Sequence, residues 1–510
     1  MKNRILKWSL LAANIAVFVL FFFIRNSVSV TGNVAMLFCL GVLAADLIYA
    51  AFVKNWLGFW FIPAQAGLVL TAYFARQAAS SSHASLHSIS TLNFIVMLAM
   101  PLLAVAFILL DLFGIGRKKI QLPASLRFLR WLLPPVLLVG LFTFALLGYD
   151  HVYNFGYSVH EYTTSRADFL FLAMIFVIAC LFLRQFISSK QGSWGEYLKR
   201  SVAVLTIFTA VAGFGFASFL RGYTSLRSDI AAAEADYQAM FGQSSKEFSG
   251  RAVPLSIPQL FFGVRHRNNY RIERDVTFRT VTEGDFAGLT LAFDAYYPMY
   301  DAIDHPANDS HGVIIWLHGS GGDKGNRPHM CKYLASKGYV VYDLQMGDRN
   351  EKNTNFPEGL HRDWNLMLES IDAFFAFATE HESAYANFDS VFIIGASMGG
   401  FLATDYIYNF EHSYQDHGVN IRGIIPLYGN VGDAEIDENS VPVLIYTGSH
   451  DGYINVRDVR QLREKYRDAG NDNAMFLEVS FAGHGPDDHF SSRGGQLKLY
   501  FLERFLGQLR

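Results

Sequence analysis

Long apolar runs dominate the first 220 residues of this 510-residue chain. A helix needs about 20 mostly apolar residues to cross the hydrocarbon core of a bilayer. A small soluble domain cannot bury a succession of such helices in its core. The sequence therefore predicts an all-α, multi-pass membrane domain over residues 1–220. Its seven expected spans are 5–24, 33–53, 57–75, 91–113, 128–148, 168–188 and 201–220, of which the third is interrupted by Pro63 and Gln65.

Basic residues between the runs predict the orientation of the chain. With a cytoplasmic N-terminus, thirteen lysines and arginines fall on the inside, and only Arg25, Arg76 and Arg166 fall on the outside. Cytoplasmic loops are the ones that carry an excess of Lys and Arg. Seven crossings then place everything after residue 220 outside the cytoplasm. We expect an integral protein of the plasma or cytoplasmic membrane with an extracytoplasmic C-terminal half.

Polar residues in the membrane half leave its purpose open. Asp46 lies within the second run, and a carboxylate at that depth is a functional hypothesis by default. No matching cation stands out in the other spans. The histidines of the outside loops do not have a diagnostic metal-ligand spacing, and the formal net charge of -3 argues against a polyanionic partner such as nucleic acid. The lipid bilayer is the partner that this half predicts.

The character of the sequence changes after residue 220. Residues 221–270 are expected to form a juxtamembrane helix, near 223–242, and a linker that contains Pro254 and Pro258. From 271 onward strands and helices alternate, and several strands are almost continuously apolar, as in sheets covered on both faces. We expect an α/β domain over 271–510 with an eight-stranded, mostly parallel sheet. The strands are expected near 272–281, 288–297, 312–318, 339–344, 390–395, 421–427, 441–447 and 474–480. The helices are expected near 327–337, 362–381, 398–410, 455–469 and 494–508.

A serine with a glycine two residues before it and another two residues after it follows the fifth of these strands. Gly395-Ala396-Ser397-Met398-Gly399 matches the pattern G-x-S-x-G, between a predicted strand and a predicted helix. In that context the pattern is typical of a sharp turn that exposes a nucleophilic hydroxyl. Ser397 is therefore the candidate nucleophile.

A serine nucleophile needs a base, and the base needs an orienting acid. Asp451 follows the seventh strand in "YTGSHDG", and His484 follows the eighth strand in "FAGHGPDDHF". The chain order serine, aspartate, histidine is the order of the α/β-hydrolase triad. Alternative candidates remain for the acid and the base, namely Asp433, Glu435 and His489.

A glycine-rich turn after the third strand supplies candidate donors for an oxyanion. The stretch "WLHGSGG" covers residues 316–322. Backbone N–H groups of Ser320 or Gly321, together with that of Met398, are the predicted oxyanion hole. His318 is expected to be a structural residue of this turn.

Residues 271–510 resemble an α/β-hydrolase of the esterase and dienelactone-hydrolase-like kind. The resemblance rests on the eight strands, the elbow after the fifth, the acid after the seventh and the histidine after the eighth. The segments "YYP" (296–298) and "GASMGG" are also similar to those of prolyl-oligopeptidase-like catalytic domains. Dienelactone hydrolases have a cysteine at the position of Ser397, which argues against that substrate. The resemblance implies no cofactor and no metal.

The sequence thus predicts a membrane-anchored, extracytoplasmic serine hydrolase that cleaves an ester through an acyl-serine, such as an esterase or deacetylase. The ester could be small, glycan-linked or lipid. Three alternatives stay open: an acyltransferase acting on a surface glycan or lipid, a prolyl-oligopeptidase-like peptidase, and a non-enzymatic receptor or scaffold. The short, acidic connection at 429–440 leaves no room for a helical lid, which favours short acyl groups.

Overall fold

A computed structural model describes the chain over nine stretches, which are 2–53, 56–81, 86–115, 223–299, 312–347, 363–410, 414–429, 433–487 and 490–510. The predicted spans at 128–148, 168–188 and 201–220 lie outside these residues. The chain divides into two compact units. The helical unit contains the N-terminal helices with residues 251–264 and 491–493, and the second unit contains residues 226–250, 265–490 and 494–510.

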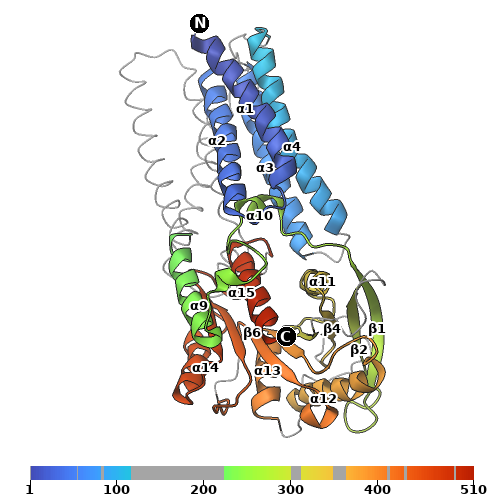
Figure 1. Cartoon of the computed structure of the whole chain (residues 1–510). Coiled ribbons are helices and arrows are strands. Elements are labelled where there is room, and N and C mark those ends of the chain that lie inside the picture. The colour runs from blue at the N-terminus through green and yellow to red at the C-terminus, as the bar shows by residue number, and fades with distance from the viewer. Residues whose placement is uncertain are drawn as a thin grey trace. The chain divides into compact units, whose positions relative to one another are not determined.

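The described part of the helical unit contains four long helices, which lie side by side (Figure 1). They are α1 (Lys2–Ile24), α2 (Val30–Val53), α3 (Trp56–Ser81) and α4 (Leu86–Leu112). Three stretches are long and apolar enough to cross a membrane, namely Arg4–Ile24, Val30–Ala50 and Thr91–Leu112. They coincide with three of the predicted spans and indicate membrane association. The predicted span 57–75 lies in α3, whose apolar stretch Trp60–Ala72 is shorter than a crossing requires.

A short helix, α10 (Ile257–Phe262), belongs to the helical unit although the sequence predicts only a linker there. Ser256 caps its first turn, and Pro258 lies where a helix needs no backbone donor. Its apolar residues are buried among α2, α3 and α4. Polar anchors fix it to the start of α2: the Ile257 N–H donates to Asn33 Oδ1 at 2.6 Å, and Asn33 Nδ2 donates to the Leu255 carbonyl at 2.9 Å. Pro254 therefore precedes a docked helix, and Pro258 lies in its first turn.

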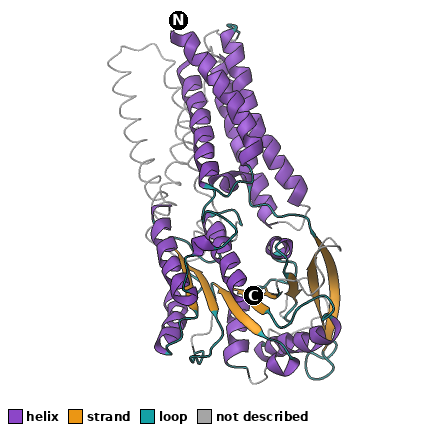
Figure 2. Ribbon diagram, in the orientation of Figure 1, coloured by secondary structure: helices purple, strands orange, loops and turns teal. Residues whose placement is uncertain are grey.

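The second unit is built on one eight-stranded sheet with helices around it (Figure 2). The strands are β1 (Tyr270–Thr280), β2 (Thr290–Pro298), β3 (Val313–Leu317), β4 (Val340–Leu344), β5 (Val391–Ala396), β6 (Ile421–Leu427), β7 (Val443–Gly448) and β8 (Ala474–Val479). The ends of all eight agree with the predicted ends within two residues, and the mostly parallel sheet is confirmed. The order is β1-β2-β4-β3-β5-β6-β7-β8. Only the β1–β2 and β2–β4 pairs are antiparallel.

The helices that follow the parallel strands cover this sheet. They are α11 (Pro328–Ser336), α12 (Trp364–His381), α13 (Met398–Tyr408), α14 (Val456–Asp468) and α15 (Arg493–Leu509), with short 3-10 turns at Ser245–Glu247 and Tyr414–His417. β3, β4 and β5 are buried along their whole length, which accounts for their apolar sequences, with Asp343 of β4 as the exception. In the sheet, β4 and β5 lie on opposite sides of β3, so the strand order reverses at β3. Ligands of open α/β sheets bind at the carboxyl ends of the strands at such a reversal.

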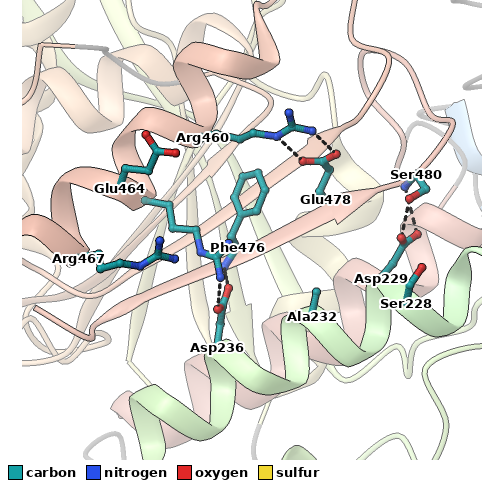
Figure 3. Close-up of a pocket in the computed structure, with 11 residues that line it drawn as sticks. Ser228, Asp229, Ala232, Asp236, Arg460, Glu464, Arg467, Phe476, Glu478 and Ser480 are labelled. Carbon is teal, nitrogen blue, oxygen red and sulfur yellow. Dashed lines mark hydrogen bonds and ion pairs between the residues drawn. The ribbon is translucent and has the colours of Figure 1, made fainter.

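Helix α9 (Leu226–Phe241) covers the outer edge of β8 (Figure 3). An edge strand exposes N–H groups that would otherwise pair with another chain. Asp236 accepts the Phe476 N–H at 3.1 Å, and Asp229, two helical turns earlier, accepts the Ser480 N–H at 3.1 Å. The Asp236 carboxylate also pairs with Arg463. The predicted juxtamembrane helix is therefore bonded to the sheet of the second unit.

Candidate active site

The nucleophile candidate lies on the turn between β5 and α13. Ser397 has φ 53° and ψ −115°, in a region that non-glycine residues rarely adopt. The two glycines of the motif allow this turn to pack. A Cβ on Gly395 would lie 2.0 Å from the Gly399 carbonyl oxygen, and one on Gly399 would lie 2.3 Å from the Leu317 oxygen of β3. Any larger residue would therefore push the turn away from the sheet.

The structure brings Ser397, His484 and Asp451 together from three separate loops. Ser397 Oγ lies 3.0 Å from His484 Nε2, and His484 Nδ1 lies 2.8 Å from Asp451 Oδ2. The Asp451 side chain is fully buried, whereas that of His484 is 19% exposed. With a proton on Nδ1, the imidazole donates to Asp451 and accepts from the serine hydroxyl. This is the hydrogen-bond order that activates a serine.

The second oxygen of Asp451 explains how its carboxylate is held. Asp451 Oδ1 accepts the N–H groups of Tyr453 and Ile454, both at 2.9 Å, so the carboxylate is oriented by its own loop. The rival acids Asp433 and Glu435 are exposed after β6 and have no such arrangement among the described residues. The rival base, His489, lies outside the described residues.

The glycine-rich loop after β3 lies against the nucleophile. A Cβ on Gly319 would be 3.5 Å from Ser397 Cβ, so the loop passes directly beside the elbow. The predicted donors Ser320 and Gly321 follow at once and are exposed. Met398 is the first residue of α13, where a helix leaves its N–H without an intrahelical partner. His318 is buried, and its Nδ1 lies 2.9 Å from the Gly319 oxygen, which fits a structural part of the turn.

Two buried carboxyl groups accept hydrogen bonds from the residues that follow this loop. The Gly325 N–H donates to Asp343 Oδ2 at 2.7 Å, and Lys324 Nζ donates to Asp294 Oδ1 at 2.9 Å. Asp294 and Asp343 are direct cross-strand neighbours on β2 and β4. Burial raises the pKa of Asp343 to about 8, against the bond from Gly325, and the charge of Asp294 adds to that increase. Burial therefore favours the protonated form of Asp343, while the charge of Asp294 is balanced by Lys324.

Two aromatic rings that the sequence pattern did not predict flank His484. The ring centroids of Tyr428 and Tyr453 lie 4.8 Å and 5.2 Å from that of His484. Tyr428 is buried with φ 44°, whereas Tyr453 is 54% exposed. Tyr453 follows Asp451 by two residues, so its place in the site could have been anticipated from that spacing.

A buried ion pair holds the segment that carries His484. Asp487 pairs with Lys498 of α15, and both side chains are almost fully buried. Burial opposes the charge of Asp487, but Lys498 and Arg327 outweigh that effect and keep its pKa below the ordinary value. In the part of the chain that the structure describes, no group of three His, Cys, Asp or Glu side chains could hold a metal ion.

A family model described as "Serine aminopeptidase, S33" matches residues 308–426. This stretch runs from β3 to β6 and includes Ser397 on its elbow. The C-terminal half of the chain is therefore an α/β-hydrolase-like domain, the hydrolase domain, with an eight-stranded, mostly parallel sheet. The predicted resemblance of this domain to α/β-hydrolases is confirmed. Asp451 and His484 lie outside the residues that the family model matches. No curated protein matches the sequence.

Solved structures that are similar to the hydrolase domain share little sequence with it. A dienelactone hydrolase of Klebsiella pneumoniae is 17% identical, with 46% of this chain and 97% of that chain covered and a TM-score of 0.33. Esterase B of Lactobacillus rhamnosis is 15% identical, with 55% of this chain and 95% of that chain covered and a TM-score of 0.35. The acylaminoacyl peptidase of Pyrococcus horikoshii is 15% identical, with 46% and 41% covered and a TM-score of 0.34.

Proposed function

We propose that the protein is a membrane-anchored serine hydrolase that cleaves a carboxylic ester through an acyl-Ser397 intermediate. The observation that carries this proposal is the unbroken hydrogen-bond chain from Ser397 through His484 to Asp451. Nucleophile, base and orienting acid each have a partner at hydrogen-bond distance. Catalytic contacts in an unliganded site are often longer than this, so the site is already organised for reaction.

The first half of the reaction forms the acyl-enzyme. Ser397 Oγ attacks the carbonyl carbon of the ester while its proton passes to His484 Nε2. The carbonyl oxygen becomes an oxyanion, which the N–H of Met398 and that of Ser320 or Gly321 stabilise. The bond between the acyl carbon and the alcohol oxygen then breaks. His484 gives its proton to the leaving alcohol, and the acyl group stays on Ser397.

The second half of the reaction releases the acid. His484 Nε2 takes a proton from a water molecule, whose oxygen attacks the acyl carbon. The bond to Ser397 Oγ breaks, and His484 returns the proton to the serine. Throughout, the buried Asp451 keeps Nδ1 protonated, and Oδ1 keeps Asp451 in place through the two backbone donors. Asp451 thus orients the imidazole and stabilises its charged form without taking the proton.

Short acyl groups on a polar carrier are the proposed substrates. The described residues between β6 and β7, which are 428–429 and 433–442, contain no helix that could act as a lid. His484 and Tyr453 remain partly open to solvent beside the nucleophile. An open site leaves a long acyl chain in water, which forgoes roughly 0.8 kcal/mol of binding per methylene. An acetyl group on a cell-surface glycan fits these conditions.

The apolar helices α1, α2 and α4 support anchoring in the membrane. The distribution of lysine and arginine supports a cytoplasmic N-terminus and an extracytoplasmic hydrolase domain. On that side of the membrane the enzyme would meet surface polymers and secreted esters.

A chain-length series tests this proposal. The full-length protein in detergent should hydrolyse acetyl esters with a higher kcat/KM than dodecanoyl esters of the same alcohol, and Ser397→Ala should hydrolyse neither. A preference for dodecanoyl esters that Ser397→Ala abolishes would keep the mechanism and contradict the open-site substrate. Turnover that survives Ser397→Ala would contradict the mechanism.

A further inference from the structure

The helical unit buries two carboxyl groups among its described helices, and they differ in their partners. Asp111 of α4 is ion-paired, because its Oδ2 lies 2.6 Å from Lys7 Nζ and 2.5 Å from the hydroxyl of Tyr49. Both Lys7 and Asp111 are less than one tenth exposed. This carboxylate is balanced by a positive charge and has hydrogen-bond donors. Asp111 is accordingly a structural link between α1, α2 and α4.

Asp46 of α2 has no ion-pair partner among the described residues. Asp46 and Asn14 of α1 are both fully buried, and Asn14 Nδ2 donates to Asp46 Oδ1 at 3.0 Å. The same Nδ2 also donates to the Leu10 carbonyl at 2.9 Å, so both of its hydrogens are used. Within the described chain, Asn14 Oδ1 and Asp46 Oδ2 have no hydrogen-bond partner. Each of the two side chains therefore has one bonded atom and one buried acceptor without a donor.

Charged groups elsewhere in the described helices do not compensate Asp46. Lys7 lies seven residues before Asn14, about 10 Å along the helix, and is held by Asp111. Arg251 bonds to Gln259 of α10, which is anchored near Asn33 at the other end of α2, about 20 Å from Asp46 along that helix. α3 contributes the amide of Gln65, which donates to the Met100 carbonyl at 2.9 Å.

One proton on Asp46 would give both unpaired oxygens of Asn14 and Asp46 a hydrogen bond. An ionised carboxylate only accepts hydrogen bonds, so ionised Asp46 leaves both free oxygens without a donor in an apolar region. A proton on Asp46 Oδ2 supplies the missing donor, and the acceptor it needs is the free Asn14 Oδ1. A carboxylic acid and a primary amide then each give one donor and one acceptor. The Nδ2–H bond to Oδ1 is present in either protonation state, so the proton can be bound and released without loss of the contact.

We propose that Asn14 and Asp46 form a proton-binding site inside the helical unit, with Asp46 as the proton carrier and Asn14 as its positioning residue. The site is separate from the hydrolase triad and does not depend on the proposed esterase activity. It gives the membrane-associated helices a titratable group of their own, of the kind that lines proton paths in membrane proteins.

Labelling with dicyclohexylcarbodiimide tests this site, because this apolar reagent reacts with protonated carboxyl groups. The carboxyl proton passes to a reagent nitrogen, the carboxylate oxygen bonds to the central carbon, and the adduct rearranges to a stable N-acylurea. The full-length protein in detergent is treated at pH 6 and pH 9, and its peptides are analysed by mass spectrometry. We expect Asp46 to be labelled at pH 6 and at least tenfold less at pH 9, with Asp111 unlabelled at both. Absence of labelling at Asp46 at pH 6, or equal labelling at pH 9, overturns the proposal.

Two variants separate the site from a merely structural contact. Asp46→Asn replaces the acid with an amide of the same shape, and we expect its melting temperature to stay within about two degrees of wild type. Asn14→Leu removes the one donor that the described residues give to the ionised carboxylate, so labelling of Asp46 at pH 9 should rise toward its value at pH 6. An unchanged pH profile in Asn14→Leu shows that Asn14 does not position the proton carrier and overturns the paired site.

Discussion

Replacing Asp451 with asparagine should nearly abolish catalysis while leaving the site assembled. Asp451 Oδ1 accepts two backbone N–H groups, from Tyr453 and Ile454. In Asp451→Asn these donors require an oxygen, so the new amide nitrogen must face His484 Nδ1. The imidazole then accepts at Nδ1 and carries its proton on Nε2, where it cannot take the proton of Ser397.

The expected loss in kcat is about 10⁴-fold, which is typical when this acid becomes an amide. At 1.36 kcal/mol per factor of ten, this corresponds to about 5.4 kcal/mol in the barrier. The assay is the hydrolysis of a short-chain ester under saturating substrate. The matched controls are Asp433→Asn and Glu435→Gln, whose exposed side chains should allow kcat to stay within about twofold. Retention of more than a tenth of wild-type kcat by Asp451→Asn, or a larger loss in either control, refutes this reasoning.

Three further predictions follow from the fold and the orientation. Gly399→Ala should reduce the yield of folded protein and its esterase activity, because the new Cβ would lie 2.3 Å from the Leu317 oxygen; normal yield and activity would contradict the packing of the elbow. Burial raises the pKa of Asp343 to about 8 from 3.8, so the folded state holds a proton that the unfolded state loses, and stability should fall as the pH rises between these values. The free energy of unfolding should fall by up to about 4 kcal/mol from pH 5 to pH 8 in the wild type and should not fall in Asp343→Asn. Thermal unfolding at both pH values measures this. The same fall in Asp343→Asn would contradict the raised pKa of Asp343. A reporter fused after Arg510 should be active only outside the cytoplasm, and activity inside would contradict the predicted orientation.

The sequence predicted the sheet closely because its physical signals are local. Strands covered on both faces are continuously apolar, and turn residues mark their ends. The elbow was recognisable because glycine alone fits where Gly395 and Gly399 pack against backbone atoms. Chain order then selected Asp451 and His484, which the structure places at hydrogen-bond distance from one another.

Features that depend on contacts between distant segments could not be predicted in the same way. Pro254 and Pro258 suggested an irregular linker, but burial among the N-terminal helices stabilises α10. The neighbouring carboxyls of Asp294 and Asp343 arise from the β2–β4 register, which no local pattern specifies. Asn14 and Asp46 likewise meet only because α1 packs on α2.

Covalent labelling of Ser397 tests the central claim most directly. A fluorophosphonate reacts with an activated serine: the hydroxyl oxygen bonds to phosphorus, fluoride leaves, and the histidine takes the proton. The full-length protein should be labelled at Ser397, as identified by peptide mass spectrometry, and His484→Ala should label at least a hundredfold more slowly. Ser397→Ala should not be labelled while it keeps the melting temperature of the wild type. Labelling that persists in Ser397→Ala, or a wild-type protein that is folded and inert to the probe, would contradict the account.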